Sequence, residues 1–284
     1  MKLPQLPISR RTLAIAAALT ATVSLAIGAH AALNLRALDA AKAVATDQGY
    51  EATRKVTRVA LIIGNGHYPD AAAPLTQPIN DARALSAALR HDGFDVDVVE
   101  DASKDDIARA VDRLRGKIRS DSIVMLFFGG YAVQAGRESY MIPVDATIWK
   151  ERDVKREGVS VESVLDVMNA QGARAKLVVL DASRRNPYER RFRTYSHGLA
   201  PVNAPENALV MLSATPGKVT DDSNGEHSVL MAEFLKNLAN NSLDANAVFR
   251  NTRVAITRTT EGEQVPSVSS SLLEEIRFAT AEAK

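Results

Sequence analysis

The sequence predicts an α/β fold with a mostly parallel central sheet and helices on both faces. Short runs that are apolar throughout, such as residues 59–63 and 177–180, alternate with longer amphipathic segments. Such runs are typical of strands covered on both faces, and their alternation with helices is typical of βαβ units. The runs are followed by loops rich in Gly, Asn, Asp and Ser, so polar chemistry is expected at the carboxyl ends of the strands.

The first elements begin at Arg58. Residues 58–63 predict a buried strand that ends in a glycine-rich loop. A helix is expected to begin near Pro78, because proline suits the first turn, and to end before Gly93. Residues 94–98 alternate apolar and acidic side chains, which predicts a half-buried strand near an edge of the sheet.

The next elements repeat the strand and helix pattern. Ser103 and Asp106 match a capping box, which predicts a helix start at this point. Residues 122–128 are apolar and predict a third strand, and a helix outlined by Val161 to Met168 leads into the fourth. A fifth strand is expected at residues 208–213. The remaining elements are expected helices at 228–238 and 246–258 and a short final strand within 264–272.

The stretch from Leu180 to Tyr188 follows the fourth strand and is expected to open into an exposed loop. In open α/β sheets, chemistry lies just past such strand ends, so Ser183 occupies the place of a nucleophile. Residues 187–206 are polar and predict an exposed linker. The linker holds Arg190, Arg191 and Arg193, which suggest a processing site, a partner patch or a solvated surface.

The N-terminal residues predict an export signal, 1–31, which places the protein in the periplasm. Basic residues precede an uncharged stretch, and an A-x-A pattern offers a cleavage site at 29–31. Arg10 and Arg11 also resemble a twin-arginine signal. The alternative is an uncleaved anchor, 12–33, in the inner membrane, because this stretch is long enough to span a bilayer. A membrane is expected as a partner only in that case.

The remaining domain boundaries follow from composition. Residues 32–57 predict a helical tether, residues 58–272 the folded domain, and residues 273–284 a C-terminal tail. The net charge of +1 and the absence of a basic stripe argue against nucleic acid as a partner. Nothing in the sequence indicates an oligomeric state.

Cysteine is absent from the chain, which excludes disulfides, thiolate metal sites and a cysteine nucleophile. Asp221 and Asp222 could bind calcium, but their spacing does not form a ligand cage, so a solvated turn is preferred. We therefore expect no metal and no cofactor.

A set of segments at the predicted strand ends resembles the caspase family, specifically the bacterial metacaspase-like (orthocaspase-like) proteins. The segments are residues 60–65, 80–82, 127–134, 142–146 and 180–184. The resemblance extends from about Arg58 to about Leu272. It implies a caspase-hemoglobinase fold and descent from cysteine endopeptidases.

The resemblance places Tyr131 and Ser183 at the positions of the family's catalytic dyad. The family has Gly-His-Gly after the third strand and Asp-Ala-Cys-Arg after the fourth, whereas this chain has Gly130-Tyr131-Ala132 and Asp181-Ala182-Ser183-Arg184. A serine needs an adjacent base, and a tyrosine with the ordinary pKa is only about 0.1% ionised at pH 7. We therefore expect an inactive pseudo-peptidase.

The resemblance also implies a substrate-binding role for Asp81 and Asp181. They match the acidic floor of the pocket in which metacaspases accept Arg or Lys, and paired carboxylates suit bidentate recognition of a guanidinium. The alternative is structural: Asp81 caps its own helix and Asp181 accepts hydrogen bonds from backbone amides.

Three functions follow from these features. The preferred one is a pseudo-caspase of the cell envelope that binds basic peptides or a protein partner. The second is an atypical hydrolase that uses Ser183 as its nucleophile, with Tyr131 or His67 as the base, although a loop histidine is more often a surface residue. The third is a purely structural envelope module.

Overall fold

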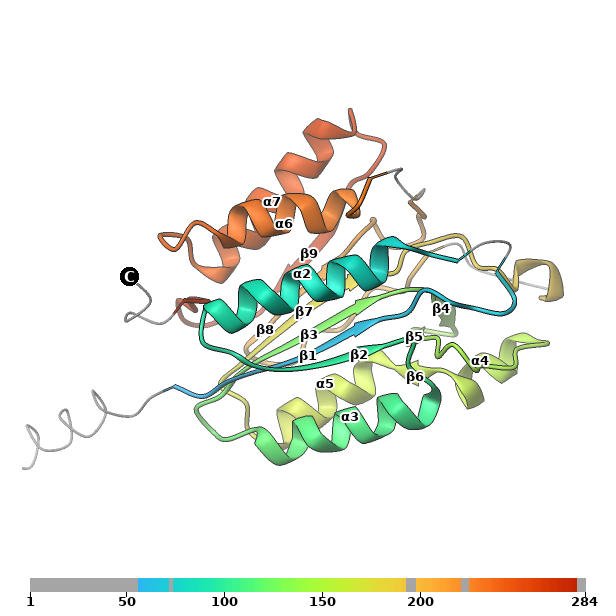
Figure 1. Ribbon diagram of the computed structural model, residues 1–284, viewed down its shortest axis with the longest axis horizontal. Coiled ribbons are helices and arrows are strands. Elements are labelled where there is room, and N and C mark those ends of the chain that lie inside the picture. The colour runs from blue at the N-terminus through green and yellow to red at the C-terminus, as the bar shows by residue number, and fades with distance from the viewer. Residues whose placement is uncertain (1–55, 72–73, 193–197, 221–224, 280–284) are drawn as a thin grey trace, which may run out of the picture. The chain divides into compact units, whose positions relative to one another are not determined.

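A computed structural model of the chain describes residues 56–71, 74–192, 198–220 and 225–279. Its centre is a six-stranded sheet in the order β2-β1-β3-β7-β8-β9 (Figure 1). The strands are β1 (Arg58–Gly64), β2 (Asp95–Glu100), β3 (Ile123–Gly129), β7 (Ala175–Asp181), β8 (Ala208–Leu212) and β9 (Ser267–Ser270). Neighbours from β2 to β8 are parallel, and β9 runs antiparallel to β8. The predicted mostly parallel sheet is confirmed.

Helices cover both faces of this sheet, as predicted (Figure 1). One face carries α2 (Gln77–His91), α6 (Val229–Leu238) and α7 (Ala245–Thr259), and the other carries α3 (Lys104–Lys117) and α5 (Val161–Ala170). Successive side chains of a strand point to opposite faces. Ile62 therefore packs in the core beneath α2, α6 and α7, while Leu61 and Ile63 pack in the core beneath α3 and α5. Two covered faces explain why the strands are apolar at almost every position.

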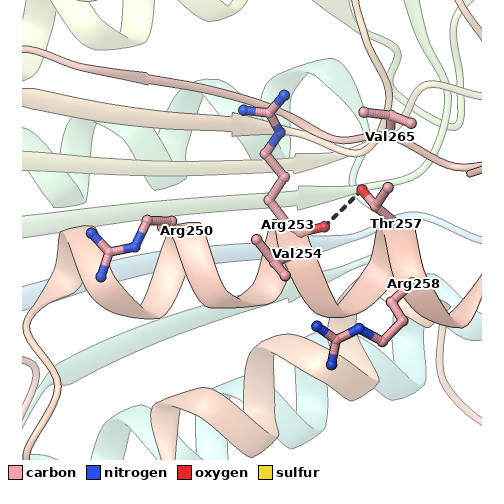
Figure 2. A pocket seen from close by; sticks show the side chains of 6 residues that line it. All are labelled: Arg250, Arg253, Val254, Thr257, Arg258 and Val265. Atoms are coloured by element: carbon pink, nitrogen blue, oxygen red, sulfur yellow. Dashed lines mark hydrogen bonds between the residues drawn. The ribbon is translucent and has the colours of Figure 1, made fainter.

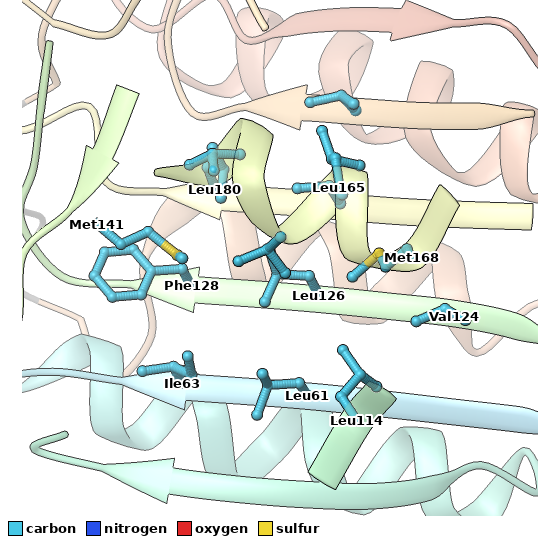
Figure 3. Close-up of a cluster of buried hydrophobic side chains, with 14 of the residues drawn as sticks. Leu61, Ile63, Leu114, Val124, Leu126, Phe128, Met141, Leu165, Met168 and Leu180 are labelled. Carbon is cyan, nitrogen blue, oxygen red and sulfur yellow. The ribbon is translucent and has the colours of Figure 1, made fainter. Parts of the chain in front are cut away.

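The core between the sheet and α5 is shown in Figure 3. Leu126 of β3 lies toward Leu165 and Met168 of α5, Phe128 of β3 lies beside Met141, and all of these side chains are buried. Burying one large apolar side chain stabilises a fold by roughly 1.5–3 kcal/mol. These layers hold the carboxyl ends of the central strands rigidly in place.

The start of α3 follows the capping box predicted from the sequence. Ser103 Oγ accepts a hydrogen bond from the Asp106 backbone N at 3.2 Å, and an Asp106 carboxylate oxygen accepts one from the Ser103 backbone N at 3.1 Å. The apolar stripe of the helix, which includes Ile107 and Leu114, is buried. The helix therefore begins where its backbone donors are satisfied by its own residues.

The stretch after β7 differs from its prediction as an exposed loop. Ser183 is 1% exposed, Arg184 5% and Tyr188 1%. The expected linker is also partly buried, since Leu199 and Val202 join the core. The reason is tertiary: the loops after β3 and β8 cover this stretch, and a local pattern of polar residues carries no signal for such contacts.

A small antiparallel sheet also lies between β3 and β7, which the sequence did not predict. Its strands are β4 (Ala132–Ala135), β5 (Glu138–Met141) and β6 (Val159–Ser160), and a short helix, α4 (Glu151–Glu157), precedes β6. Strands this short carry little periodicity, so the pattern in the sequence is weak. A 3₁₀ turn, η1 (Glu189–Arg191), follows β7.

The C-terminal boundary lies beyond Leu272, where the sequence predicted the domain to close. Ile276 and Phe278, within the expected tail, are buried, and the Phe278 ring centroid lies 6.2 Å from that of Phe234 in α6. The predicted export signal, 1–31, and most of the tether lie outside the described residues. Within the described ranges, no helix has the length and apolar character needed to cross a bilayer.

Candidate functional site

The candidate site lies where β1, β3 and β7 end. Gly129 of β3 is in register with both Gly64 of β1 and Asp181 of β7. The Asn65 backbone N donates a hydrogen bond to the Gly129 carbonyl at 2.9 Å, and the Gly130 N donates to the Asp181 carbonyl at 3.4 Å. The parallel register therefore brings the loops after these strands together at one edge of the sheet.

Asn65 holds the loops of this edge to one another. Its side chain is fully buried, and its Oδ1 accepts a hydrogen bond from the Ala102 backbone N at 2.8 Å. Its Nδ2 donates to the Ile142 carbonyl at 3.2 Å. These bonds join the loop after β1 to the loops after β2 and β5, so the walls of the site are cross-linked by buried polar contacts.

Tyr131 packs in an aromatic pair with Tyr68. Its ring packs edge-on against Tyr68, with the centroids 4.9 Å apart, and its backbone N donates to Tyr68 Oη at 3.1 Å. Tyr68 Oη in turn donates to the Ile142 carbonyl at 2.9 Å. Gly130 has φ of +151°, and a Cβ there would lie 2.5 Å from Tyr68 Oη, so this tight contact requires glycine.

Ser183 is buried with its hydroxyl unused. Its backbone N donates to Ser213 Oγ at 3.1 Å, and its carbonyl accepts from the Thr220 N at 2.7 Å. Ser183 Oγ has no hydrogen-bond partner among the described residues. The structure therefore contains no hydrogen bond from Tyr131, or from any described base, that would activate this hydroxyl.

Asp181 lies beside Arg184 but uses only part of its hydrogen-bonding capacity. Arg184 Nη1 lies 3.9 Å from Asp181 Oδ1, and the same nitrogen donates to the backbone carbonyls of Asp181 and Gly130. Asp181 Oδ2 is buried and has no partner in the described part of the chain. If backbone amides satisfied the Asp181 carboxylate, Oδ2 would accept a hydrogen bond from one of them, and among the described residues it accepts none.

Asp81 faces Asp181 and does not cap its own helix. It lies inside α2, beyond the Thr76 cap position, and its side chain is fully buried. Its Oδ1 lies 2.8 Å from His227 Nδ1, and both of its oxygens accept from the Ser228 backbone N at 3.3 Å. Burial, and next the charge of Asp181, raise the pKa of Asp81 to about 6 against the opposing hydrogen bonds from His227 and Ser228.

The raised pKa predicts how Asp81 affects stability as pH changes. The ordinary value is 3.8 and the folded value about 6, so the folded protein holds this proton more tightly than the unfolded chain does. The contribution is fully present below about pH 4 and is lost as pH rises through about 6. Relative to Asp81→Asn, we expect the wild type to lose roughly 2–3 kcal/mol of unfolding free energy between about pH 4 and pH 7.5.

Urea unfolding at a series of pH values measures this difference. The variant Asp181→Asn serves as the control, because it removes the neighbouring charge and should make the pH dependence shallower. A difference between the wild type and Asp81→Asn that stays constant with pH would contradict the assignment.

The other predicted residues lie apart from this pair. His67 is exposed, and its Nδ1 lies 2.6 Å from Asp101 Oδ2 in the loop after β2, while β3 lies between its strand and the strand of Ser183. Arg191 pairs with Asp70 at 2.7 Å and lies 4.7 Å from the Trp149 ring. Arg193, Asp221 and Asp222 lie outside the described residues.

His227 is the site residue that the sequence did not predict. It directly precedes Ser228, whose side chain accepts a hydrogen bond from the Met231 N and caps α6. The predicted start of this helix could have indicated His227, because the residue before a helix that follows a parallel strand lies at the carboxyl edge of the sheet. Its contact with Asp81 joins residues 146 positions apart and has no local pattern.

Two hollows of the described surface are lined by other residues. One, of about 410 Å³, lies along α7 and is lined by Arg250, Arg253, Val254, Thr257, Arg258 and Val265 (Figure 2). A second, of about 350 Å³, shares Val265 and reaches the loop after β8. Neither is lined by Asp81, Asp181 or Ser183. The two carboxylates are themselves buried in this structure.

The comparison with known families agrees with the fold. A sequence model described as the caspase domain matches residues 57–277, which is most of the chain. A search of curated proteins gives no match.

Proposed function

The chain belongs to the caspase family, and we propose that it is a catalytically inactive, metacaspase-like member that binds basic side chains. The binding site of this proposal is the pair Asp81 and Asp181, and the ligand is an Arg or Lys residue of a peptide or protein partner. The N-terminal pattern adds the location: the periplasm after export, or the inner membrane if residues 12–33 stay attached.

Inactivity is supported by the surroundings of Ser183 and Tyr131, which this proposal places at the dyad positions. The Ser183 hydroxyl is buried and unpaired, and its backbone N is engaged by Ser213 Oγ. An oxyanion site requires a backbone donor directed at the substrate, and this donor is already in use. Tyr131 is committed to its contact with Tyr68.

Cation binding rests on one observation: the buried Asp181 Oδ2 has no partner in the described residues, beside a second carboxylate. Leaving a buried charged acceptor unsatisfied is costly, and two adjacent negative charges add to this cost. An incoming guanidinium or ammonium group would supply the missing hydrogen-bond donor to Asp181 Oδ2 and a second positive charge beside Arg184. Asp81 and Asp181 together therefore favour a bound cation over burial without a ligand.

Fluorescence anisotropy tests the proposal with a labelled hexapeptide that has one central Arg and a matched peptide that has norleucine at that position. We expect saturable binding of the Arg peptide alone. Asp181→Asn should weaken it by roughly 10-fold to 150-fold, since a hydrogen bond to a charged group contributes about 1.5–3 kcal/mol. Equal binding of both peptides, or no effect of Asp181→Asn, would refute the assignment.

One contact favours an active hydrolase as the second candidate. The buried Asp81 orients His227 through Nδ1, as a carboxylate orients the base in a Ser-His-Asp triad. This candidate requires His227 to reach Ser183 Oγ, which has no hydrogen-bond partner in the described structure. A fluorophosphonate probe distinguishes the two, because an activated Ser183 would become labelled and an inert one would stay unlabelled between pH 6 and 9.

A further inference from the structure

The segment 225–228 lies directly over the start of α2. Gln77 Nε2 donates to the Gly225 carbonyl at 3.0 Å, and Asn80 Nδ2 donates to the Glu226 carbonyl at 3.1 Å. The next two residues contact Asp81, through the His227 ring and the Ser228 backbone N. Each of the four residues in this short segment is therefore attached to the first turns of one helix.

This segment occupies the Asp81 carboxylate with a basic side chain of the same protein. His227 Nδ1 contacts Oδ1 at 2.8 Å, and the Ser228 N is shared between both oxygens. A guanidinium that binds a carboxylate in the bidentate manner donates to both of its oxygens. The imidazole and an incoming basic side chain therefore compete for the same acceptor.

Carboxylates lie on both sides of the contact between the imidazole and α2. Asp81 faces it from α2, and Asp181 of β7 adds its charge to the same carboxylate. Glu226 precedes it and is exposed, while Arg184, in the loop after β7, is buried against Asp181. His227 thus lies in an acidic environment, and its side chain remains 27% exposed.

We propose that segment 225–228 is an internal plug, in which His227 takes the position of a ligand's basic side chain until the segment is displaced. The inference rests on the proposed cation site and adds its regulation. It also explains why the Asp81 carboxylate is occupied although a basic ligand would need it. Displacement breaks the hydrogen bonds to Gln77, Asn80 and Asp81, none of which belongs to a strand pair.

Calorimetric titration of the full-length protein with Nα-acetyl-arginine amide tests the plug. We expect His227→Ala to bind this probe at least about 10-fold more tightly than the wild type, which corresponds to about 1.4 kcal/mol. The matched control is His67→Ala, since His67 is also a loop histidine paired with an aspartate at this edge of the sheet. The control should bind as the wild type does.

A second variant keeps the test independent of folding defects. His227→Gln retains a neutral donor for Asp81, so its affinity is expected between those of the wild type and His227→Ala. In the wild type, the NMR signals of the His227 ring should shift when the probe saturates the protein, because the ring is displaced from Asp81.

The outcomes separate the plug from the cation site. If the wild type and His227→Ala bind equally and Asp181→Asn abolishes binding, the cation site stands and the plug is refuted. If neither the wild type nor His227→Ala binds the probe, the cation site itself is refuted, and the plug falls with it.

Discussion

We expect the purified full-length protein to leave peptides that contain Arg or Lys uncleaved, with or without calcium. Loss of both the nucleophile and its base removes about six orders of magnitude of rate from a catalytic unit, so turnover should be indistinguishable from the background. The structure adds a second reason, because Ser183 Oγ is buried and lacks any described partner. Release of a fluorophore from an Arg reporter peptide measures this result.

The control for this prediction restores the dyad chemistry. Tyr131→His with Ser183→Cys supplies a nucleophile and a base, but segment 225–228 still occupies Asp81. We therefore expect little activity from this double variant and a measurable gain when His227→Ala is added. Wild-type turnover that disappears in Ser183→Ala would contradict the proposed inactivity.

The largest expected loss of stability follows from Arg184→Ala. Arg184 is 5% exposed, donates to the Gly130 carbonyl at 3.1 Å, and lies 3.9 Å from Asp181 Oδ1. Its removal leaves a buried carboxylate without its cation and a buried carbonyl without its donor. Breaking a buried ion pair in this way costs roughly 3–5 kcal/mol. Chemical denaturation at pH 7.5 measures the change in the free energy of unfolding.

Two further variants test whether the burial of Arg184 causes the loss of stability in Arg184→Ala. Arg184→Lys keeps the charge but not the planar set of donors, so a smaller loss is expected. Arg152→Ala removes an exposed arginine of α4 and should change the free energy of unfolding by less than about 0.5 kcal/mol. A loss for Arg184→Ala as small as that for Arg152→Ala would contradict the role assigned to the buried pair.

The fold could be predicted from the sequence where each element carries its own signal. Ser103 and Asp106 mark the start of α3 through contacts within one turn, and the run at 123–128 is apolar because both faces of β3 are covered. The register of the parallel strands then places Asp181 and the loop after β1 at the same edge. The approach of Asp81 to Asp181 follows from this arrangement.

The burial of Ser183 could not be predicted, because it depends on segments that are distant in the sequence. Thr220 and Ser213 approach it from the loop after β8, and the contact of His227 with Asp81 joins that loop to α2. A polar residue after a strand has the same local pattern whether other loops cover it or not. The sequence therefore indicated the position of the site but not that the site is closed.

The most direct test of the account is the mass spectrum of an Arg-containing peptide after prolonged incubation with a saturating concentration of the wild-type protein. We expect the wild-type protein to bind the peptide and to leave it intact. Binding should be weaker in Asp181→Asn. A peptide cleaved after its Arg by the wild type, but not by Ser183→Ala, would contradict the account.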